Sequence, residues 1–524
     1  MHSAPGRAVL ALLLALAAGC AGPKAPPSSM DRDLPIDGWL LVESPGLAIV
    51  SAGGEQRTLE LVHDLQVFRA VARTLTHASV EPRVPMQILL FPNERAYAYY
   101  RPYRHVAGET QPSSRGFVLS MSADSPTLHQ VLFHEYTHFL LFNQSPSYPQ
   151  WYHEGFAEVL GSVSIREHVV TVGSLVGPRE STLIRADRLP PLEAVLGARS
   201  YQEVWKQLDG FYAQSWLLTH LLVLGEYAGY PRRTDSLRAY LARLQRSSDW
   251  RAAFDASFPE GLDALAKDLE SYRQRVVGES FVPRLRLDAR KLNGVETAVS
   301  LRPLAPADAA VELGAGYLDR GTYAARYAER VFERALERDP AHARAHAGLA
   351  EARSMLGDFV RASAELERAV SGAPDDAFVL RARGAVLLLQ ADSLREKDAA
   401  GADAARASAR EVLRRAIALE PDVPEAGVLL GRSYLGAPGD AAEGVAALAA
   451  ACAVLPWDDD TNLDLARLYL QTGQPGRALP HVERVLRWAD GAALEQARAL
   501  KGEIEKSAPG ADSAATPRAD GTGS

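Results

Sequence analysis

The sequence predicts an α+β domain followed by an all-α solenoid. Residues 36–304 mix short apolar runs of strand length with longer runs whose apolar residues recur at helical spacing. From residue 305 onward helical pairs recur with a regular period, marked by Pro340 and Pro374, which are 34 residues apart. The chain has 524 residues, which is long enough for two or more domains with real cores.

The first 20 residues have the form of a secretory signal. Arg7 precedes an apolar core from Ala8 to Ala18, which is too short to span a membrane. The run that ends in Gly19-Cys20 resembles the lipobox of bacterial lipoproteins, whose cysteine becomes the lipidated first residue. This resemblance implies a lipid anchor at Cys20 in the outer membrane, facing the periplasm. The alternative is an ordinary cleaved signal with an accidental cysteine.

Composition limits the other possibilities. Cys20 and Cys452 are the only cysteines, so no disulfide framework is expected even in an exported chain. The net charge is −8 and the basic residues form no cluster, which makes nucleic acid an unexpected partner. Residues 21–35 are rich in Pro and Ser and predict a flexible tether. Residues 507–524 predict a disordered tail.

The elements of the first domain follow from local patterns. Apolar runs predict the strands and helically spaced apolar residues predict the helices. The expected strands are 39–43, 47–50, 84–91 and 116–121, a strand-like pair around 169–172, and a strand hairpin over 282–301; the expected helices cover 59–71, 125–143, a segment from Trp151, a segment from Phe211, 237–244 and 262–272.

One helix carries the motif His-Glu-Tyr-Thr-His at residues 134–138. Ser125 is a plausible N-cap for this helix and Pro126 fits its first position. On a helix, His134 and His138 lie one turn apart on the same face, which is the separation a single zinc ion needs. Glu135 would then hold and deprotonate a water molecule.

The residues downstream narrow the class of zinc site. Peptidases with three histidine ligands need a glycine and a histidine where this chain has Leu141 and Gln144. The remaining large class takes a glutamate from a second helix. The segment Pro-Gln-Trp-Tyr-His-Glu-Gly-Phe-Ala-Glu-Val-Leu, residues 149–160, resembles the signature of the gluzincin metallopeptidases, particularly the peptidase MA-like group.

This resemblance implies a thermolysin-like fold for residues 36–304, with Zn²⁺ as the cofactor. It makes Glu154 the third ligand and Glu158 the acid that supports a ligand histidine. His153 is a less favoured ligand. From its place in the family, Tyr212 would donate a hydrogen bond to the oxyanion, and a buried core tyrosine is the alternative.

Two further features leave alternatives open. The strand 116–121 corresponds to a family strand at the sheet edge that pairs with an extended substrate, or it is a plain sheet strand. The aromatic cluster Tyr97, Tyr99, Tyr100 and Tyr103 would line a substrate cleft or pack against the surface.

Residues 305–506 carry the small and large positions of the tetratricopeptide repeat, in about five copies. A polar insertion around 392–407 lengthens one copy. Such arrays have concave surfaces that bind peptides or partner proteins, and a simple spacer is the alternative.

Taken together, the resemblances imply a zinc-dependent peptidase of the bacterial cell envelope whose repeats recruit a substrate or partner protein. A catalytically inactive, lipid-anchored scaffold that acts through the repeats is the alternative. An amidase acting on cell-wall peptides would share the chemistry and differ only in its substrate.

Overall fold

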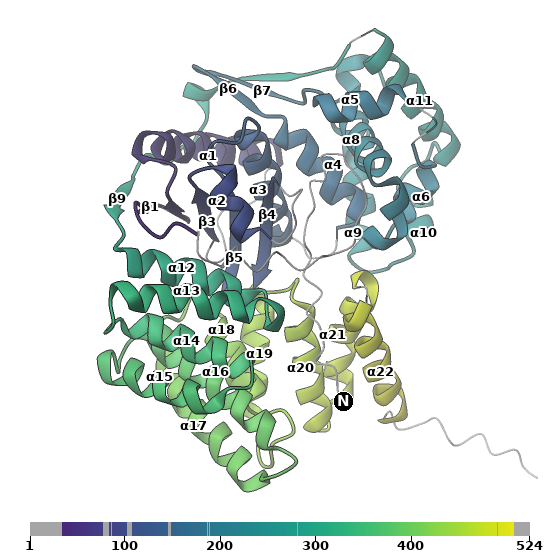
Figure 1. Cartoon of the computed structure of the whole chain (residues 1–524). Helices are drawn as coiled ribbons and strands as arrows, with labels where there is room; N and C mark the ends of the chain where they lie inside the picture. Colours follow the sequence, from purple (N-terminus) through teal and green to yellow (C-terminus); the bar gives the residue numbers. More distant parts are fainter. Residues whose placement is uncertain are drawn as a thin grey trace, which may run out of the picture.

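The computed structural model describes residues 34–507 except 77–82, 85, 102–106, 145–147, 186, 188, 280 and 490. The predicted signal with Cys20, nearly all of the predicted tether, Tyr103 and the tail after Ser507 lie outside the described residues. Within them, an α+β domain is followed by an array of helices (Figure 1). No helix in this described part is both long enough and apolar enough to cross a membrane.

A six-stranded mixed sheet forms the centre of the first domain, in the order β4-β5-β3-β2-β1-β9. The pairs β2-β3 and β3-β5 are parallel and the others are antiparallel. A smaller antiparallel sheet has the order β6-β7-β8. The strands are β1 (Leu40–Ser44), β2 (Leu47–Ser51), β3 (Met86–Phe91), β4 (Gly108–Ser113), β5 (Gly116–Ser122), β6 (Ser164–Arg166), β7 (Val169–Val172), β8 (Leu285–Asp288) and β9 (Ser300–Pro303).

The structure decides one strand prediction and corrects another. Of the two alternatives for residues 116–121, the plain sheet strand is the correct one, because β5 lies between β3 and β4. The edge belongs to β4, whose sequence Gly-Glu-Thr-Gln-Pro-Ser carries no strand signal. Residues 282–301 do not form a hairpin, because β8 pairs with β7 whereas β9 crosses to the large sheet and pairs with β1 as its second antiparallel partner.

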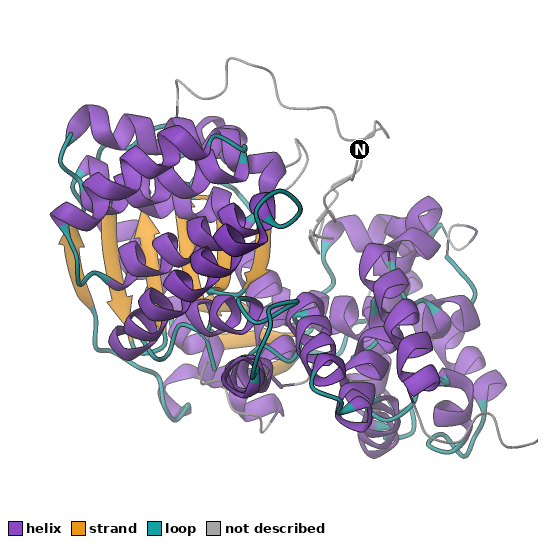
Figure 2. Ribbon diagram, turned by 90° about the horizontal axis from the view of Figure 1, so that it is seen from below, coloured by secondary structure: helices purple, strands orange, loops and turns teal. Residues whose placement is uncertain are grey.

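Helices cover both faces of the large sheet (Figure 2). The side chains of strand β3 contribute to the cores on both faces. Side chains alternate between the faces of a strand. Ile88 and Leu90 therefore join one core with α1 (Glu55–Thr76) and α3 (Leu128–Gln144), whereas Leu89 and Phe91 join a second core on the opposite face. That second core includes α2 (Glu94–Tyr100) and the first solenoid helix, α12 (Pro306–Asp319).

The helical half of the first domain is built around α8 (Leu208–Leu224), most of whose residues are buried. It contacts the motif helix α4 (Gln150–Gly161) and several shorter helices. The other helices of this half are α5 (Gly177–Ile184), α6 (Leu192–Gly197), α7 (Tyr201–Val204), α9 (Thr234–Leu244), α10 (Trp250–Asp255) and α11 (Leu262–Gly278).

The solenoid consists of successive helix pairs and a last helix, α22. The polar insertion predicted around 392–407 lengthens the pair α16 and α17. After α12 the helices are α13 (Ala325–Arg338), α14 (Ala343–Met355), α15 (Phe359–Gly372), α16 (Ala377–Leu394), α17 (Ala399–Leu419), α18 (Glu425–Arg432), α19 (Ala442–Val454), α20 (Asp459–Gln471), α21 (Pro475–Trp488) and α22 (Gly491–Ser507).

The solenoid touches the first domain at both of its ends. At the first end, α12 packs on the sheet, and Tyr100 of the aromatic cluster lies in that shared core. Near the far end, the Trp457 ring lies 4.8 Å from the Phe117 ring, and Arg199 donates to the carbonyl oxygen of Arg487. Tyr97 and Tyr100 are therefore packing residues of the domain interface.

Candidate metal centre

Helix α3 presents the two motif histidines on one face. It begins at Leu128, two residues after the predicted first position, and Ser125 Oγ accepts a hydrogen bond from the Thr127 amide just before it. The Nε2 atoms of His134 and His138 lie 3.0 Å apart, and both side chains are almost completely buried.

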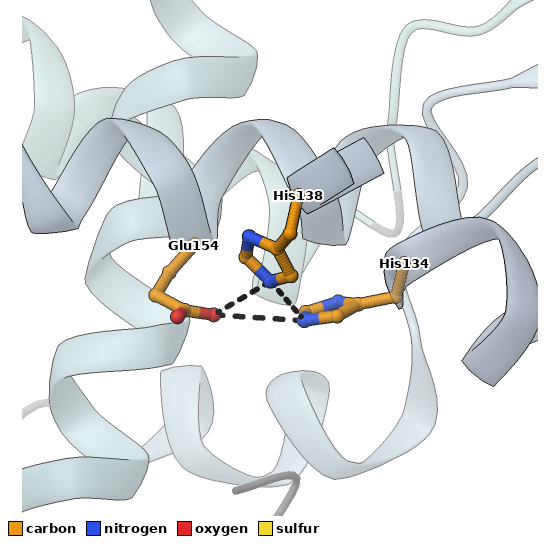
Figure 3. Close-up of side chains that lie close together, drawn as sticks. All are labelled: His134, His138 and Glu154. Carbon is orange, nitrogen blue, oxygen red and sulfur yellow. Dashed lines mark hydrogen bonds and ion pairs between the residues drawn. The ribbon is translucent and has the colours of Figure 1, made fainter. Parts of the chain in front are cut away.

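Helix α4 brings Glu154 to the same point (Figure 3). Its Oε2 atom lies 3.6 Å from Nε2 of His134 and 3.8 Å from Nε2 of His138. A point equidistant from the three atoms lies about 2.0 Å from each, which is the bond length zinc makes to imidazole nitrogen and carboxylate oxygen. These three residues form the one group of three potential ligands among the described residues.

Gly155 allows this approach of α4. A Cβ atom built on Gly155 would lie 2.2 Å from the backbone oxygen of Ser215 and 2.2 Å from Oγ1 of Thr219, both on α8. Because such a contact is impossible, only glycine lets α4 cross α8 this closely with Glu154 directed at α3. The glycine in the motif is therefore explained by helix packing.

Glu158 lies one turn after Glu154 and supports His134 from the other side of the ring. Its Oε1 atom lies 3.7 Å from Nδ1 of His134 and accepts a hydrogen bond of 2.7 Å from Nη2 of Arg179 on α5. Burial raises the pKa of Glu158, but the guanidinium of Arg179 more than offsets this, so the pKa lies below its usual value and the carboxylate stays charged.

Glu135 is held by the edge strand β4. Its Oε2 atom accepts a hydrogen bond of 3.1 Å from the backbone N–H of Thr110, whereas Oε1 is buried without a hydrogen-bond partner in the described part of the chain. Burial raises the pKa of Glu135 to about 8. The Thr110 N–H of this edge strand is therefore already taken by Glu135, and Thr110 is 1% exposed.

Tyr212 lies on α8 next to Arg179, whose guanidinium carbon is 4.8 Å from the centre of the phenol ring. Burial and then the charge of Glu154 raise the pKa of Tyr212 well above its usual value. The phenol is therefore protonated and able to donate a hydrogen bond.

The electrostatics of the site favour a cation between the ligands. Burial lowers the pKa of His134, but the nearby carboxylates of Glu154 and Glu158 more than offset this and raise the pKa. Burial and the neighbouring charge of His134 lower the pKa of His138. Buried carboxylates thus stabilise one positive charge at this point, and a donor set of two imidazoles and a carboxylate suits zinc.

The two other histidines of the motif region, His129 and His153, do not belong to the group of potential ligands. His129 is on the surface of α3, where Nε2 lies 2.8 Å from Asp64. His153 is buried beside Phe142, and burial lowers its pKa to about 3. Thr110 and Arg179 are site residues that the motifs do not reveal, because neither belongs to a recognisable pattern.

Comparison with known protein families identifies the type of repeat in the helical array. Residues 319–385 match the tetratricopeptide repeat family. The chain contains tetratricopeptide repeats. This confirms the repeat type predicted from the 34-residue period, and such repeats generally mediate contacts between proteins. The chain matches no curated protein sequence.

Two solved structures are similar to part of this chain. A thermophilic tetratricopeptide repeat protein from Thermus thermophilus is 21% identical with a TM-score of 0.30, covering 38% of this chain and 98% of its own. Pseudomonas aeruginosa PilF is 21% identical with a TM-score of 0.28, covering 39% of this chain and 92% of its own. At such low TM-scores these likenesses say nothing about function.

Proposed function

We propose that the chain is a zinc-dependent peptidase, in which His134, His138 and Glu154 hold the metal. The observation that carries the proposal is the convergence of three buried ligand atoms beside the half-satisfied carboxylate of Glu135. The gluzincin resemblance of residues 149–160 supports the same interpretation. We also propose, from the sequence, that Cys20 anchors the protein to the outer membrane on its periplasmic side.

The residues around the ligands have separate roles in the proposed reaction. Bound zinc would polarise a peptide carbonyl and lower the pKa of a water molecule to about 7. A cation held by the three ligands would lower the pKa of Glu135 again and keep its carboxylate ionised. Glu135 would then accept a proton from the attacking water at Oε1, while Thr110 holds Oε2, and would deliver the proton to the leaving amine. Tyr212 would donate a hydrogen bond to the developing oxyanion. Glu158 would keep the ring of His134 in place.

The first experiment is metal analysis of the protein lacking residues 1–20. About one zinc per chain is expected, lost in Glu154→Ala and retained but weakened in Glu158→Ala. His129→Ala is the matched control, because His129 is a surface histidine on the same helix and should leave the metal content unchanged. Absence of zinc after metal is added back would overturn the proposal.

The second experiment tests the reaction with Glu135→Gln. This variant keeps the shape of the side chain and removes its ability to accept a proton. It should bind zinc but hydrolyse peptide substrates at least about 10²-fold more slowly than the unmutated chain. Hydrolysis at the unmutated rate would exclude Glu135 as the base. A panel of protein and cell-wall peptides would then show which amide bonds are cleaved.

A further inference from the structure

Strand β4 lies between the candidate metal centre and the solenoid. Its Thr110 N–H holds Glu135, the proposed base. Its two neighbours, Glu109 and Gln111, are each 3% exposed or less. Successive side chains in a strand point in opposite directions, so whatever holds Glu109 and Gln111 also fixes Thr110 between them.

The solenoid holds these two side chains with one arginine. Arg320 follows α12 directly and is 3% exposed. Its Nη2 atom donates to Glu109 Oε2 at 2.7 Å, and its Nε atom donates to Gln111 Oε1 at 3.0 Å. The guanidinium also lies 4.4 Å from the ring centre of Tyr100. This arginine therefore ties both flanks of Thr110 to the first repeat.

A second arginine reaches the opposite way, from the first domain into the solenoid. Arg115 lies in the two-residue turn between β4 and β5. Its Nε atom is 2.8 Å from Glu425 on α18 and 3.3 Å from Asp319 on α12. Its Nη2 atom is 4.0 Å from Glu351 on α14. Carboxylates from three separate solenoid helices thus surround one guanidinium, and each of them is almost buried.

The Arg115 side chain lies among charged residues of the solenoid helices. Arg381 of α16 pairs with both Glu351 and Glu425, which completes a network with three carboxylates and two guanidiniums. A cavity of about 220 Å³ remains beside Arg115, lined by solenoid helices and by the start of β5. Part of the solenoid surface formed by α12, α14 and α18 is therefore occupied by this chain's own β4–β5 turn.

We propose that the solenoid positions the active site: Arg320 and Arg115 form a reciprocal clamp on β4, and the clamped strand holds Glu135 through Thr110. Both arginines are positioning residues. The inference rests on the proposed peptidase function for its catalytic consequence, whereas the clamp itself is a property of the folded chain. The repeats then act on the reaction directly, in addition to any partner they recruit.

The clamp predicts a separation of kinetic effects. Glu135 handles the proton of the attacking water and does not bind the substrate, so a displaced β4 should lower kcat and leave KM nearly unchanged. Misplacement of a catalytic group by about 1 Å can slow a reaction by about 10²-fold. For Arg320→Ala and Arg115→Ala we expect kcat to fall by about tenfold or more, with KM within about twofold.

The test uses the full chain lacking only residues 1–20, with Arg320→Ala, Arg115→Ala and the milder Arg115→Lys. Arg414→Ala is the matched control, because Arg414 pairs with Glu443 at an exposed site in the solenoid. Amide hydrogen exchange of residues 108–113 is measured alongside zinc content and peptide hydrolysis. Exchange of this segment should become about tenfold faster in both alanine variants, less so in Arg115→Lys, and should not change in Arg414→Ala.

The readouts separate the clamp from the peptidase proposal. Unchanged exchange of residues 108–113 in both alanine variants would overturn the clamp, whatever the enzyme does. Faster exchange with unchanged kcat would overturn the positioning of Glu135. Zinc content and hydrolysis by the unmutated chain test the peptidase proposal independently. If the alanine variants fail to fold, hydrogen exchange of residues 108–113 in Arg115→Lys tests the clamp by itself, and unchanged exchange would overturn it. Lys keeps the charge of Arg115 but cannot contact three carboxylates at once.

Discussion

The motif glycine at position 155 offers a sharp test of how the metal centre is built. In Gly155→Ala the new methyl carbon would lie 2.2 Å from the Ser215 backbone oxygen. That distance is about 1 Å shorter than a normal contact, and a backbone oxygen inside α8 cannot swing away. Helices α4 and α8 must therefore separate. Overpacking of this kind destabilises by about 1–3 kcal/mol, partly offset by about 0.5–1 kcal/mol of better helix propensity.

The same displacement should weaken zinc binding. Glu154 precedes Gly155, and ligand distances in a metal site tolerate only about 0.2 Å of error. We expect the midpoint of thermal unfolding to fall by roughly 2–8 °C and zinc affinity to fall by about tenfold or more.

The assays are calorimetry of the metal-free chain and competition with a chromophoric chelator. Gly278→Ala is the control, since a methyl group there would meet nothing within 4 Å. A Gly155→Ala variant with unaltered melting and zinc affinity would refute the packing argument.

Three further predictions follow from other contacts. Glu158→Gln should lower zinc affinity by about 10–100-fold in a chelator competition, because His134 loses a charged support; equal affinity would argue that Glu158 serves only Arg179. Free zinc at about 100 times its dissociation constant should stabilise the fold by about 2.7 kcal/mol in thermal unfolding, and His138→Ala should abolish that gain. Phe332→Ala should destabilise the first repeats by about 3–5 kcal/mol in denaturant unfolding. The Phe332 ring packs directly on two glycines: a Cβ atom added at Gly314 would lie 2.7 Å from the ring, and one added at Gly348 would lie 2.2 Å from it.

Local patterns were sufficient for the parts of the site that lie on single helices. The 3.6-residue turn fixes the relation of His134 to His138, and the second motif helix supplies Glu154 from 16 residues further on. The structure brings these three residues together. The spacing of Pro340 and Pro374 was likewise enough to predict the repeats, because each repeat is a local unit.

Contacts between residues far apart in the chain could not be predicted from the sequence. Strand β4 has little strand propensity of its own, and its neighbours in space determine that it forms a strand. Thr110 meets Glu135 across 25 residues, and Arg320 meets Glu109 across 211. A single sequence offers no signal for such pairs. The crossing of residues 282–301 between two sheets was missed for the same reason.

The shared core of the sheet and α12 affects the order in which the chain can fold. Domains usually fold as units during synthesis, beginning from the N-terminus. Here one face of the sheet is covered by α12, and β1, starting at Leu40, gains its outer partner only when β9 has emerged. Wherever the chain folds, the first domain therefore keeps apolar surface exposed until the segment up to residue 319 is also available to pack. A chaperone that shields this half-made sheet would find its binding site along β1 and the α12-facing side of β3.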